Sequence, residues 1–346
     1  MNNFESSWHK FVSSGDFLSF SLEWEHGISE SKRFKLPNGL SAKLFDTGLL
    51  QIEPNQPSQT KLLISSGVHG NETAPMEIMQ QIVDKIWKGQ LTVNVNLMLV
   101  IGNPPATNLG KRFLDQNLNR LFSKRYLDSK TQDYETERAK TIESAVTQFF
   151  TKKDQNQTFY HFDLHTAIRP SQYEKFVVYP FMHDKPWDLE HIAFFGGSDI
   201  TTILLGNHPA GTFSYFTSNQ FDALSATVEL GKVKPFGEND MNKFSGIYQN
   251  LCRLIEDKPT HCKKFDNDIY KIFKVKQEII KANTEFKLLL SDDVKNFTSF
   301  NKGTLLASDG KNENYFVEQD GESIVFPNNN VPVGQRVGVL LKSVKL

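Results

Sequence analysis

The chain has 346 residues, of which 38% are hydrophobic and 23% are charged, and its formal net charge at pH 7 is −1. This length is enough to bury a sizeable core in one large domain or two moderate ones. A nearly neutral chain has no overall field that would attract nucleic acid or an acidic membrane surface, so we expect neither as a partner. Charged ligands must therefore be bound by local groups.

The N-terminal sequence MNNFESSWHKFVSSGDF lacks the basic stretch and continuous apolar run of a secretory signal. No run approaches the ~18 apolar residues that suggest a membrane-spanning helix. The two cysteines, Cys252 and Cys262, are too few for a disulfide framework and lack zinc-finger spacing. These features predict a soluble cytoplasmic protein, and they do not indicate any oligomeric state.

Strand-like and helix-like segments follow one another along most of the chain. The N-terminal region is mixed, and FLSFSLEWEH fits either a strand or a short helix. The next segments in chain order are a β-hairpin over 41–54, a strand over 61–68, a helix over 71–89, a strand over 93–101, a helix over 131–150, strands over 158–167 and 226–232, and a helix over 241–257. Strands alternating with helices predict an α/β domain with a largely parallel sheet flanked by helices.

The pattern of predicted secondary structure changes after about residue 262. Short β-type segments such as YKIFKVKQEIIKAN and GQRVGVLLKSV are separated there by Gly, Asp and Asn turns. We therefore expect two parts: a catalytic α/β domain over 1–262, with a β-rich N-terminal lead-in, and a smaller β-rich domain over 263–346.

Polar residues that could bind a ligand lie at the ends of the predicted strands. His69, Asn103, His165 and Glu229 each fall at or just beyond such an end. In open α/β sheets, ligands bind outside the carboxyl ends of the strands. These side chains are therefore the first candidates for a functional site.

The spacing of His69 and Glu72 is compatible with a metal site. Catalytic zinc commonly has three protein ligands, including two His and one Glu, and keeps a fourth position for water. Strand alternation in FYHFDLHTA places His161, Asp163 and His165 on one face, and His165 at the strand end is the better third ligand. Asp163 could fix the tautomer of a ligating histidine. Each histidine alone is more often structural, but together their strand-end positions favour a metal.

Glu229 ends an apolar β-type run in TVELGKVKPFG, where an unpaired carboxylate is costly. Beside a metal it could accept a proton from water and later pass it to a leaving amine. A simpler alternative is an ion pair with Lys232 or Lys234 at the strand exit. We favour the catalytic role.

The segment NPPATNLGKRFLDQNLNRLF reads as a loop that carries Arg112, Asn119 and Arg120. Guanidinium groups bind carboxylates through paired hydrogen bonds and can stabilise a developing oxyanion. Surface arginines are common, so the composition of this loop alone leaves the role of all three residues open.

Five blocks in order, GVHGNETAP, GNPPA, GKRFLDQNLNRLF, DLHTAIRPSQY and VELGKVKPFGEND, resemble the succinylglutamate desuccinylase and aspartoacylase family. That family belongs to the zinc-carboxypeptidase-like superfamily, and the last two blocks resemble its desuccinylase branch more closely. The resemblance spans about residues 60–245, and the β-rich tail is also of the expected kind. It implies the zinc-carboxypeptidase-like fold and one zinc ion per subunit, held by His69, Glu72 and His165.

The same resemblance implies roles for further residues. Glu229 would be the general acid/base, Arg112 would polarise the scissile carbonyl, and Asn119 and Arg120 would hold a substrate carboxylate. Arg169, four residues after His165, is our own addition as a ligand of the succinyl carboxylate, and a surface salt bridge explains it equally well.

The implied activity is zinc-dependent hydrolysis of N-succinyl-L-glutamate to succinate and L-glutamate, the last step of the arginine succinyltransferase route. Two alternatives remain open: deacylation of another acidic N-acyl amino acid, as in aspartoacylase, and a zinc-binding homologue without catalysis. Because these ligand types also accept other first-row ions, the identity of the metal is a separate question.

Overall fold

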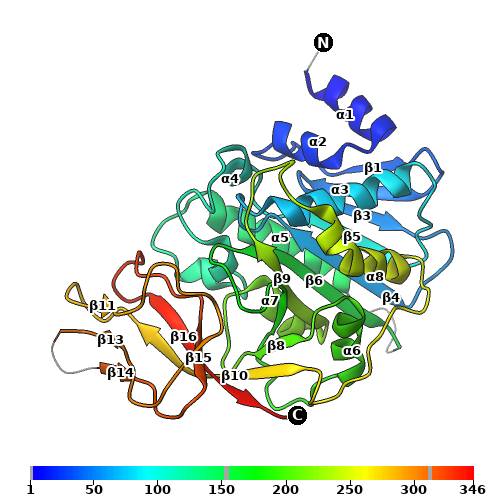
Figure 1. Ribbon diagram of the computed structural model, residues 1–346. Helices are drawn as coiled ribbons and strands as arrows, with labels where there is room; N and C mark the ends of the chain where they lie inside the picture. Colours follow the sequence, from blue (N-terminus) through cyan, green and yellow to red (C-terminus); the bar gives the residue numbers. More distant parts are fainter. Residues whose placement is uncertain (1–2, 152–155, 311–313) are drawn as a thin grey trace.

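The computed structural model describes residues 3–151, 156–310 and 314–346 (Figure 1). In these ranges the strands form a 13-stranded sheet and a separate 3-stranded sheet. The order in the large sheet is β1-β2-β3-β5-β4-β6-β9-β7-β8-β10-β16-β15-β12, and in the small sheet β11-β13-β14. The N-terminal helices and the C-terminal β-rich part lie at opposite ends of the molecule in Figure 1.

The strands of the described residues are β1 (Lys32–Lys35), β2 (Ser41–Asp46), β3 (Leu49–Glu53), β4 (Thr60–Ser66), β5 (Asn96–Ile101), β6 (Thr158–Ala167), β7 (Phe176–Tyr179), β8 (Thr202–Leu205), β9 (Leu224–Lys232), β10 (Lys271–Ile280), β11 (Lys287–Leu288), β12 (Thr298–Phe300), β13 (Leu305–Ser308), β14 (Asn314–Phe316), β15 (Glu322–Val325) and β16 (Arg336–Val344). The α-helices are α1 (Asn3–Ser14), α2 (Phe17–Glu23), α3 (Thr73–Trp87), α4 (Pro104–Asn108), α5 (Tyr134–Phe150), α6 (Leu189–Gly197), α7 (Phe213–Phe221) and α8 (Ser245–Ile255). Three 3₁₀ turns add η1 (Leu118–Arg120), η2 (Arg125–Asp128) and η3 (Met241–Phe244).

Four central strands are parallel and fix the position of the site. β5 pairs with β4, β4 with β6, and β6 with β9, all in parallel register. Their carboxyl ends therefore lie at one edge of the sheet, as expected for a ligand site in this architecture. Antiparallel pairs occur mainly outside this centre, so the sheet is mixed with a parallel middle.

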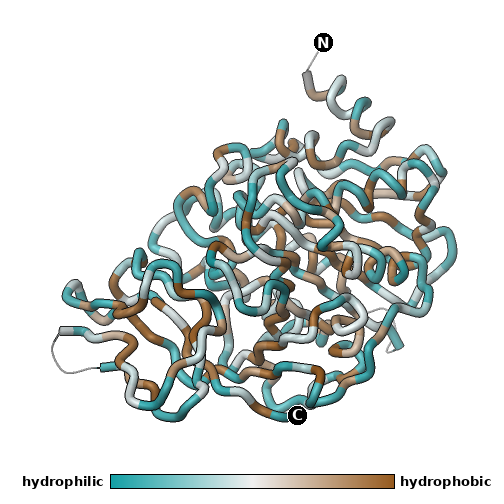
Figure 2. The backbone as a smooth tube through the Cα atoms, in the orientation of Figure 1, coloured by the Kyte–Doolittle hydropathy of each residue, from teal (hydrophilic) through white to brown (hydrophobic). Residues whose placement is uncertain are grey.

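Helices cover both faces of the sheet. One core contains buried residues of α1, α2, α3, α6 and α8 against the strands, and a second contains those of α5 and α7. Figure 2 shows hydrophobic residues gathered along the central strands and hydrophilic residues along the outer loops. The expected α/β fold, with helices flanking a mixed sheet, is confirmed.

The C-terminal β-rich part continues the main sheet. β10 pairs in parallel with β8 over Lys271–Lys274 and antiparallel with β16 over most of its length. Ile279, Leu306, Val317 and other buried residues form a separate small core there. A smaller β-rich C-terminal part is therefore confirmed, whereas the boundary at residue 262 stays a prediction about how the sequence is divided.

The lead-in is not β-rich from its start: α1 was not predicted, and α2 takes the helical one of the two alternatives for FLSFSLEWEH, ahead of β1–β3. In α1, Phe4, Trp8 and Phe11 recur at helical spacing and pack against Phe20 of α2. Aromatic residues are common in strands as well, so this short segment did not reveal its helical period.

The segment between residues 176 and 221 also holds elements that the sequence did not predict. The strands β7 and β8 have four residues each, and α6 is buried on nearly all sides, so none of them shows a clear alternation of apolar and polar positions. Across the described ranges, no helix combines the length and apolar character needed to cross a membrane.

Candidate metal centre and active site

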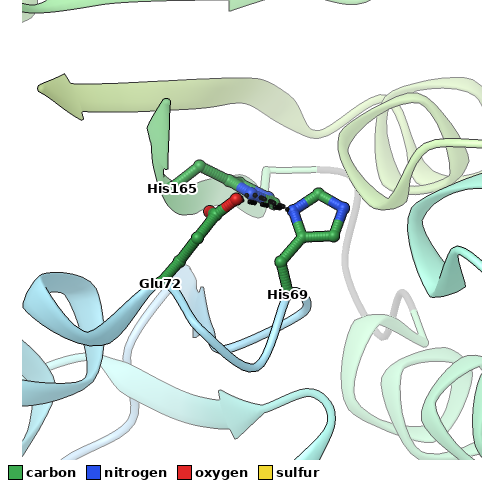
Figure 3. A group of neighbouring side chains, drawn as sticks. All are labelled: His69, Glu72 and His165. Atoms are coloured by element: carbon green, nitrogen blue, oxygen red, sulfur yellow. Dashed lines mark hydrogen bonds and ion pairs between the residues drawn. The ribbon is translucent and has the colours of Figure 1, made fainter. Parts of the chain in front are cut away.

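Three side chains from separate elements converge at the carboxyl edge of the parallel strands (Figure 3). His69 lies in the turn after β4, Glu72 is the residue before α3, and His165 lies near the end of β6. His69 Nδ1 is 2.9 Å from Glu72 Oε1, and His165 Nδ1 is 3.0 Å from Glu72 Oε2. The two Nδ1 atoms are 3.2 Å apart, and all three residues are buried. These residues are the predicted ligand set.

The tautomer of each histidine follows from the partner of its other nitrogen. Asn117 Oδ1 accepts the backbone N–H of Asn119 at 3.0 Å, so His69 Nε2, also 3.0 Å away, must be the donor to this oxygen. His165 Nε2 faces Asp163 Oδ2 at 3.0 Å and donates to it. With both rings neutral, as metal ligands must be, both Nδ1 lone pairs would then point toward the carboxylate of Glu72.

This arrangement fits a divalent metal ion. Lone pairs on two nitrogens and two carboxylate oxygens repel one another unless a positive charge lies among them. Zinc bonds of 2.0–2.1 Å in tetrahedral geometry separate neighbouring donor atoms by about 3.3 Å. The observed 2.9–3.2 Å is close to this spacing, and the His₂Glu set is a common one for catalytic zinc.

The charges of the site are consistent with a cation. Burial lowers the pKa of His69 to about 4, which keeps this ring neutral, as a metal ligand must be. Burial alone would raise the pKa of Glu72, but His69, His165 and Arg112 hold it well below its usual range. For His165, the carboxylates of Asp163 and Glu72 outweigh burial and raise its pKa. The site therefore favours positive charge beside an ionised Glu72.

The turn that carries two of the ligands depends on a glycine. A Cβ atom on Gly70 would lie 2.3 Å from the backbone of Ala106 and Thr107, at the end of α4. The N–H of Gly70 also donates to the carbonyl of Arg112 at 3.0 Å. The close approach of the two loops thus requires glycine in HGNE, because any side chain would separate them.

Glu229 lies beside the three ligands. It is the register partner of His165 on the neighbouring strand β9, so both side chains leave the same face of the sheet. Glu229 is 8% exposed, and its Oε2 has no hydrogen-bond partner among the described residues. Burial, with the charge of Glu72, raises the pKa of Glu229 to about 7. A carboxyl group in this range can both accept and donate a proton near neutral pH.

The simpler explanation of Glu229, an ion pair with a lysine, finds no support in the described ranges. Neither Lys232 nor Lys234 forms a salt bridge with Glu229 there, and Lys234 Nζ donates to the Glu238 carbonyl at 3.3 Å. The buried carboxylate therefore faces the ligand group with one oxygen available.

The loop after α4 supplies polar groups around the ligands. Arg112 Nη1 is 2.6 Å from Glu72 Oε1, and Asn117 holds His69. Asn119 Oδ1 accepts the N–H of Phe213 at 2.8 Å, at the start of α7. Arg120 is exposed and donates to the carbonyl of Asn119 at 2.7 Å. The loop thus brings the predicted Arg112, Asn119 and Arg120 to the region of the ligands.

Glu135, in the first turn of α5, holds the backbone of this loop in place. Its carboxylate is fully buried and accepts hydrogen bonds from the backbone N–H groups of Leu114 at 2.7 Å and Asp115 at 3.2 Å. It also accepts one from the side chain of Asn103 at 3.0 Å. No sequence pattern marks Glu135 as functional, because a Glu in the first turn of a helix is explained by the helix dipole alone.

A buried polar chain extends from His165 into the sheet. Asp163 Oδ1 accepts from Ser65 Oγ at 2.5 Å, and Ser65 Oγ lies 2.8 Å from His161 Nε2. His161 Nδ1 is 2.7 Å from Thr217 Oγ1 on α7. Strand alternation indicated that His161, Asp163 and His165 share one face of the strand. The hydrogen bonds of Ser65 and Thr217 to these residues could not be predicted, because they depend on which elements pack together in space.

Arg169 lies outside the ligand group. Its Nη1 donates to the backbone carbonyl of Asp292 in the C-terminal part. Neither the predicted binding of a succinyl carboxylate nor the alternative surface salt bridge is part of this contact. The role of Arg169 stays a prediction.

Two family models match the chain. Residues 58–255 match the model described as succinylglutamate desuccinylase/aspartoacylase catalytic domain, and residues 268–344 match the AstE/AspA barrel-sandwich hybrid domain. Together they span both the α/β part and the β-rich part of the chain.

The chain is also similar to proteins with assigned names. It is 43% identical to a succinylglutamate desuccinylase of Pseudoalteromonas atlantica over 334 residues, which is 95% of each chain. It is 42% identical to one of Idiomarina loihiensis, over 93% of this chain and 94% of the relative. A crystal structure of the protein of that name from Vibrio parahaemolyticus superposes with a TM-score of 0.86 at 32% identity, over 95% of each chain. The chain therefore belongs to the succinylglutamate desuccinylase/aspartoacylase family and is a hydrolase.

Proposed function

We propose that the chain is a zinc-dependent amidohydrolase that cleaves N-succinyl-L-glutamate to succinate and L-glutamate. The observation that carries the proposal is the convergence of His69, Glu72 and His165 with Glu229 in register beside them. The relatives of about 40% identity that cover nearly the whole chain carry the name of this activity. The reaction's place in arginine breakdown is part of the same proposal and is supported by the family resemblance.

His69, Glu72 and His165 would hold the metal. When bound, zinc would supply Lewis acidity to a substrate carbonyl and make water a stronger nucleophile near pH 7. The ligands need little rearrangement for this, because Asn117 and Asp163 already fix the tautomers of the two histidines.

Glu229 moves the proton in this proposal. It accepts a proton from the attacking water and then donates it to the nitrogen of the departing glutamate, so that the amide C–N bond breaks with a neutral amine as the leaving group. Its pKa of about 7 suits both transfers. Arg112, which lies against Glu72, is placed to donate a hydrogen bond to the developing oxyanion.

Asn119 and Arg120 bind a substrate carboxylate in this proposal. The amide oxygen of Asn119 is used by the N–H of Phe213, which leaves its amide nitrogen for an acceptor. The guanidinium of Arg120 uses Nη1 for one backbone carbonyl, and its other N–H groups can bind a carboxylate. A substrate with three carboxylates suits a loop with several arginines.

The central test combines metal analysis with a substrate panel. Purified protein should contain about one zinc per chain, lose activity with a chelator and regain it with zinc. Release of the free amino acid should be fastest from N-succinyl-L-glutamate within a panel that includes N-acetyl-L-aspartate, N-acetyl-L-glutamate and N-succinyl-L-aspartate. Faster release from N-acetyl-L-aspartate would favour the aspartoacylase-like alternative instead.

Replacement of Glu229 tests the proposed base. Glu229→Gln should keep the metal but lower kcat by about 10²–10⁴-fold, the usual contribution of a general acid/base. Glu238→Gln, an exposed residue nearby, is the matched control and should behave as wild type. Wild-type turnover in Glu229→Gln would contradict the mechanism, and a zinc-loaded wild-type protein without activity on the whole panel would support a homologue without catalysis.

A further inference from the structure

The loop beside the metal centre holds more positive charge than its carboxylates balance. Arg112 is paired with Glu72, but the ion pairs of the described residues include no carboxylate partner for Arg120 or Arg125. Arg125 Nη2 donates instead to the carbonyl of Pro209 at 3.1 Å, and Arg120 to that of Asn119. Unpaired guanidinium groups at a solvent-accessible position can bind an anion.

A second loop joins these arginines to the C-terminal part. The carbonyl of Gly211 accepts the N–H of Phe122 at 3.1 Å, and a Cβ atom on Gly211 would lie 2.2 Å from the carbonyl oxygen of Arg120. The same loop carries His208, whose Nε2 is 3.2 Å from Glu278 Oε1 on β10. The loop is therefore packed between the Arg120 segment and the antiparallel pair of strands β10 and β16.

Arg336, the first residue of β16, completes this arrangement. Its Nη1 is 2.6 Å from Glu278 Oε1, the oxygen that also faces His208. The side chains of Arg336 and Glu278 are 33% and 25% exposed, so solutes can reach them from the solvent. One Nη1 contact leaves the other donors of the guanidinium free to bind a second carboxylate.

The charges of Arg336 and Arg120 affect one another. Arg120 is open to solvent along part of its side chain, but the protein atoms packed around its guanidinium lower its pKa by desolvation; the charges of Arg336 and then Arg112 lower it further, whereas Glu278 acts in the opposite direction. Arg120 still remains charged near pH 7. Holding like charges near one another costs free energy, and an anion bound between them would offset this cost.

We propose that Arg336 is a specificity-determining residue of the active site, which binds a carboxylate of the acidic substrate together with Arg120 while Glu278 and His208 hold it in place. The inference rests on the proposed function, because it takes the substrate to be an N-acyl amino acid with several carboxylates. It gives the C-terminal β-rich part a direct role in substrate recognition.

Kinetics of three variants and one control variant test this role. Arg336→Ala should raise the KM for N-succinyl-L-glutamate about tenfold to a hundredfold, as expected for a lost charge-assisted hydrogen bond, with a smaller effect on kcat. Arg336→Lys should be intermediate, because a point charge replaces the fork of donors. Glu278→Gln keeps Arg336 but loosens it, so it should raise KM less. Lys342→Ala, which removes an exposed cation from the same strand, should leave KM unchanged.

Substrate analogues identify the carboxylate. N-butyryl-L-glutamate lacks the succinyl carboxylate, and N-succinyl-L-glutamine lacks the side-chain carboxylate of glutamate. Wild type should prefer the full substrate over both analogues. Arg336→Ala should no longer distinguish the full substrate from the analogue that lacks the carboxylate bound by Arg336. If both preferences and KM stay at wild-type values in Arg336→Ala, the inference is wrong while the proposed function stands.

Equilibrium binding separates the two proposals. Titration of succinate and of L-glutamate into zinc-loaded protein should give at least one affinity that Arg336→Ala weakens by tenfold or more and Lys342→Ala does not. A wild-type protein inactive on N-succinyl-L-glutamate would overturn the proposed function. Equal affinities of wild type and Arg336→Ala for both products, or no binding of either to wild type, would overturn the role of Arg336.

Discussion

Asp163 Oδ2 lies 3.0 Å from His165 Nε2, two residues along the same strand, and both side chains are buried. The carboxylate holds the ring so that Nδ1 faces the ligand group. Asp163→Asn removes the charge and offers an amide in its place, so we expect zinc affinity to fall about 10–100-fold. Competition with a chromophoric chelator measures this directly.

A matched control comes from the same strand. Thr166 contributes its backbone N–H to Glu72 at 2.9 Å, whereas its buried hydroxyl has no partner among the described residues. Thr166→Val keeps the backbone contact and should bind zinc like wild type. Equal zinc affinity of Asp163→Asn and Thr166→Val would show that the Asp163 contact does not tune the site.

Glu135 should be essential for the active-site loop. In the wild type, backbone N–H groups of the loop donate to both carboxylate oxygens of Glu135. Glu135→Gln replaces one of these oxygens with an amide nitrogen, and a buried donor left without its acceptor costs about 1–3 kcal/mol. We expect a loss of unfolding free energy in this range, measured by urea denaturation, together with reduced turnover. The exposed Glu137, two residues along the same helix, gives the control Glu137→Gln, which should be neutral. Full turnover in Glu135→Gln would mean that the loop holds its shape without this anchor.

A side chain at position 70 should disturb the candidate metal centre by steric overlap. Its would-be Cβ overlaps with the backbone of Ala106 and Thr107, so Gly70→Ala must separate the two loops. We expect a destabilisation of about 1–3 kcal/mol, typical of overpacking, together with weaker zinc binding. Gly110→Ala is the comparison: this glycine has a φ of +61° but no atom within 4 Å of its would-be Cβ, so it should keep wild-type zinc affinity. A Gly70→Ala protein with wild-type stability and zinc affinity would contradict the proposed contact.

Buried His191 should make stability depend on pH. Burial lowers its pKa from 6.5 to about 4, so the unfolded chain binds this proton more readily than the folded one. The stabilising contribution is complete above pH 6.5 and is lost as the pH falls toward 4, by up to about 3 kcal/mol. His191→Gln, which can still form a hydrogen bond with the Tyr179 hydroxyl, should flatten the decline in unfolding free energy over this pH range.

The control for this prediction is His9→Gln, at an exposed position. It should keep the wild-type slope of unfolding free energy against pH. If His191→Gln keeps the same slope as well, other groups cause the acid sensitivity.

Much of the site could be predicted because its main residues are tied to regular elements. His69 and Glu72 follow from the end of a strand and the start of a helix, and His165 and Glu229 from the ends of two further strands. Parallel strands bring such ends to one edge whatever the details of the loops. The central fold and the grouping of these four residues therefore followed from the hydrophobic pattern and the motifs.

The remaining contacts depend on how the loops fold back in space. Asn117, Glu135 and Arg336 act through partners 21 to 58 residues away or across separate loops, and no local pattern marks them. Helix α1 was missed, and α2 was left open between strand and helix, for a different reason: their aromatic residues suit strands as well as helices, and packing against one another decides between the two.

The shared sheet limits how this protein can be taken apart. Lys271–Lys274 of β10 pairs with Thr202–Leu205 of β8, whose four residues are all buried. Cutting the chain after residue 262 would strip β8 of this neighbour and leave a bare apolar edge that invites association with other chains. The α/β part and the β-rich part therefore cannot be exchanged between proteins as independent domains, unless β10 stays with the α/β part whose sheet it extends.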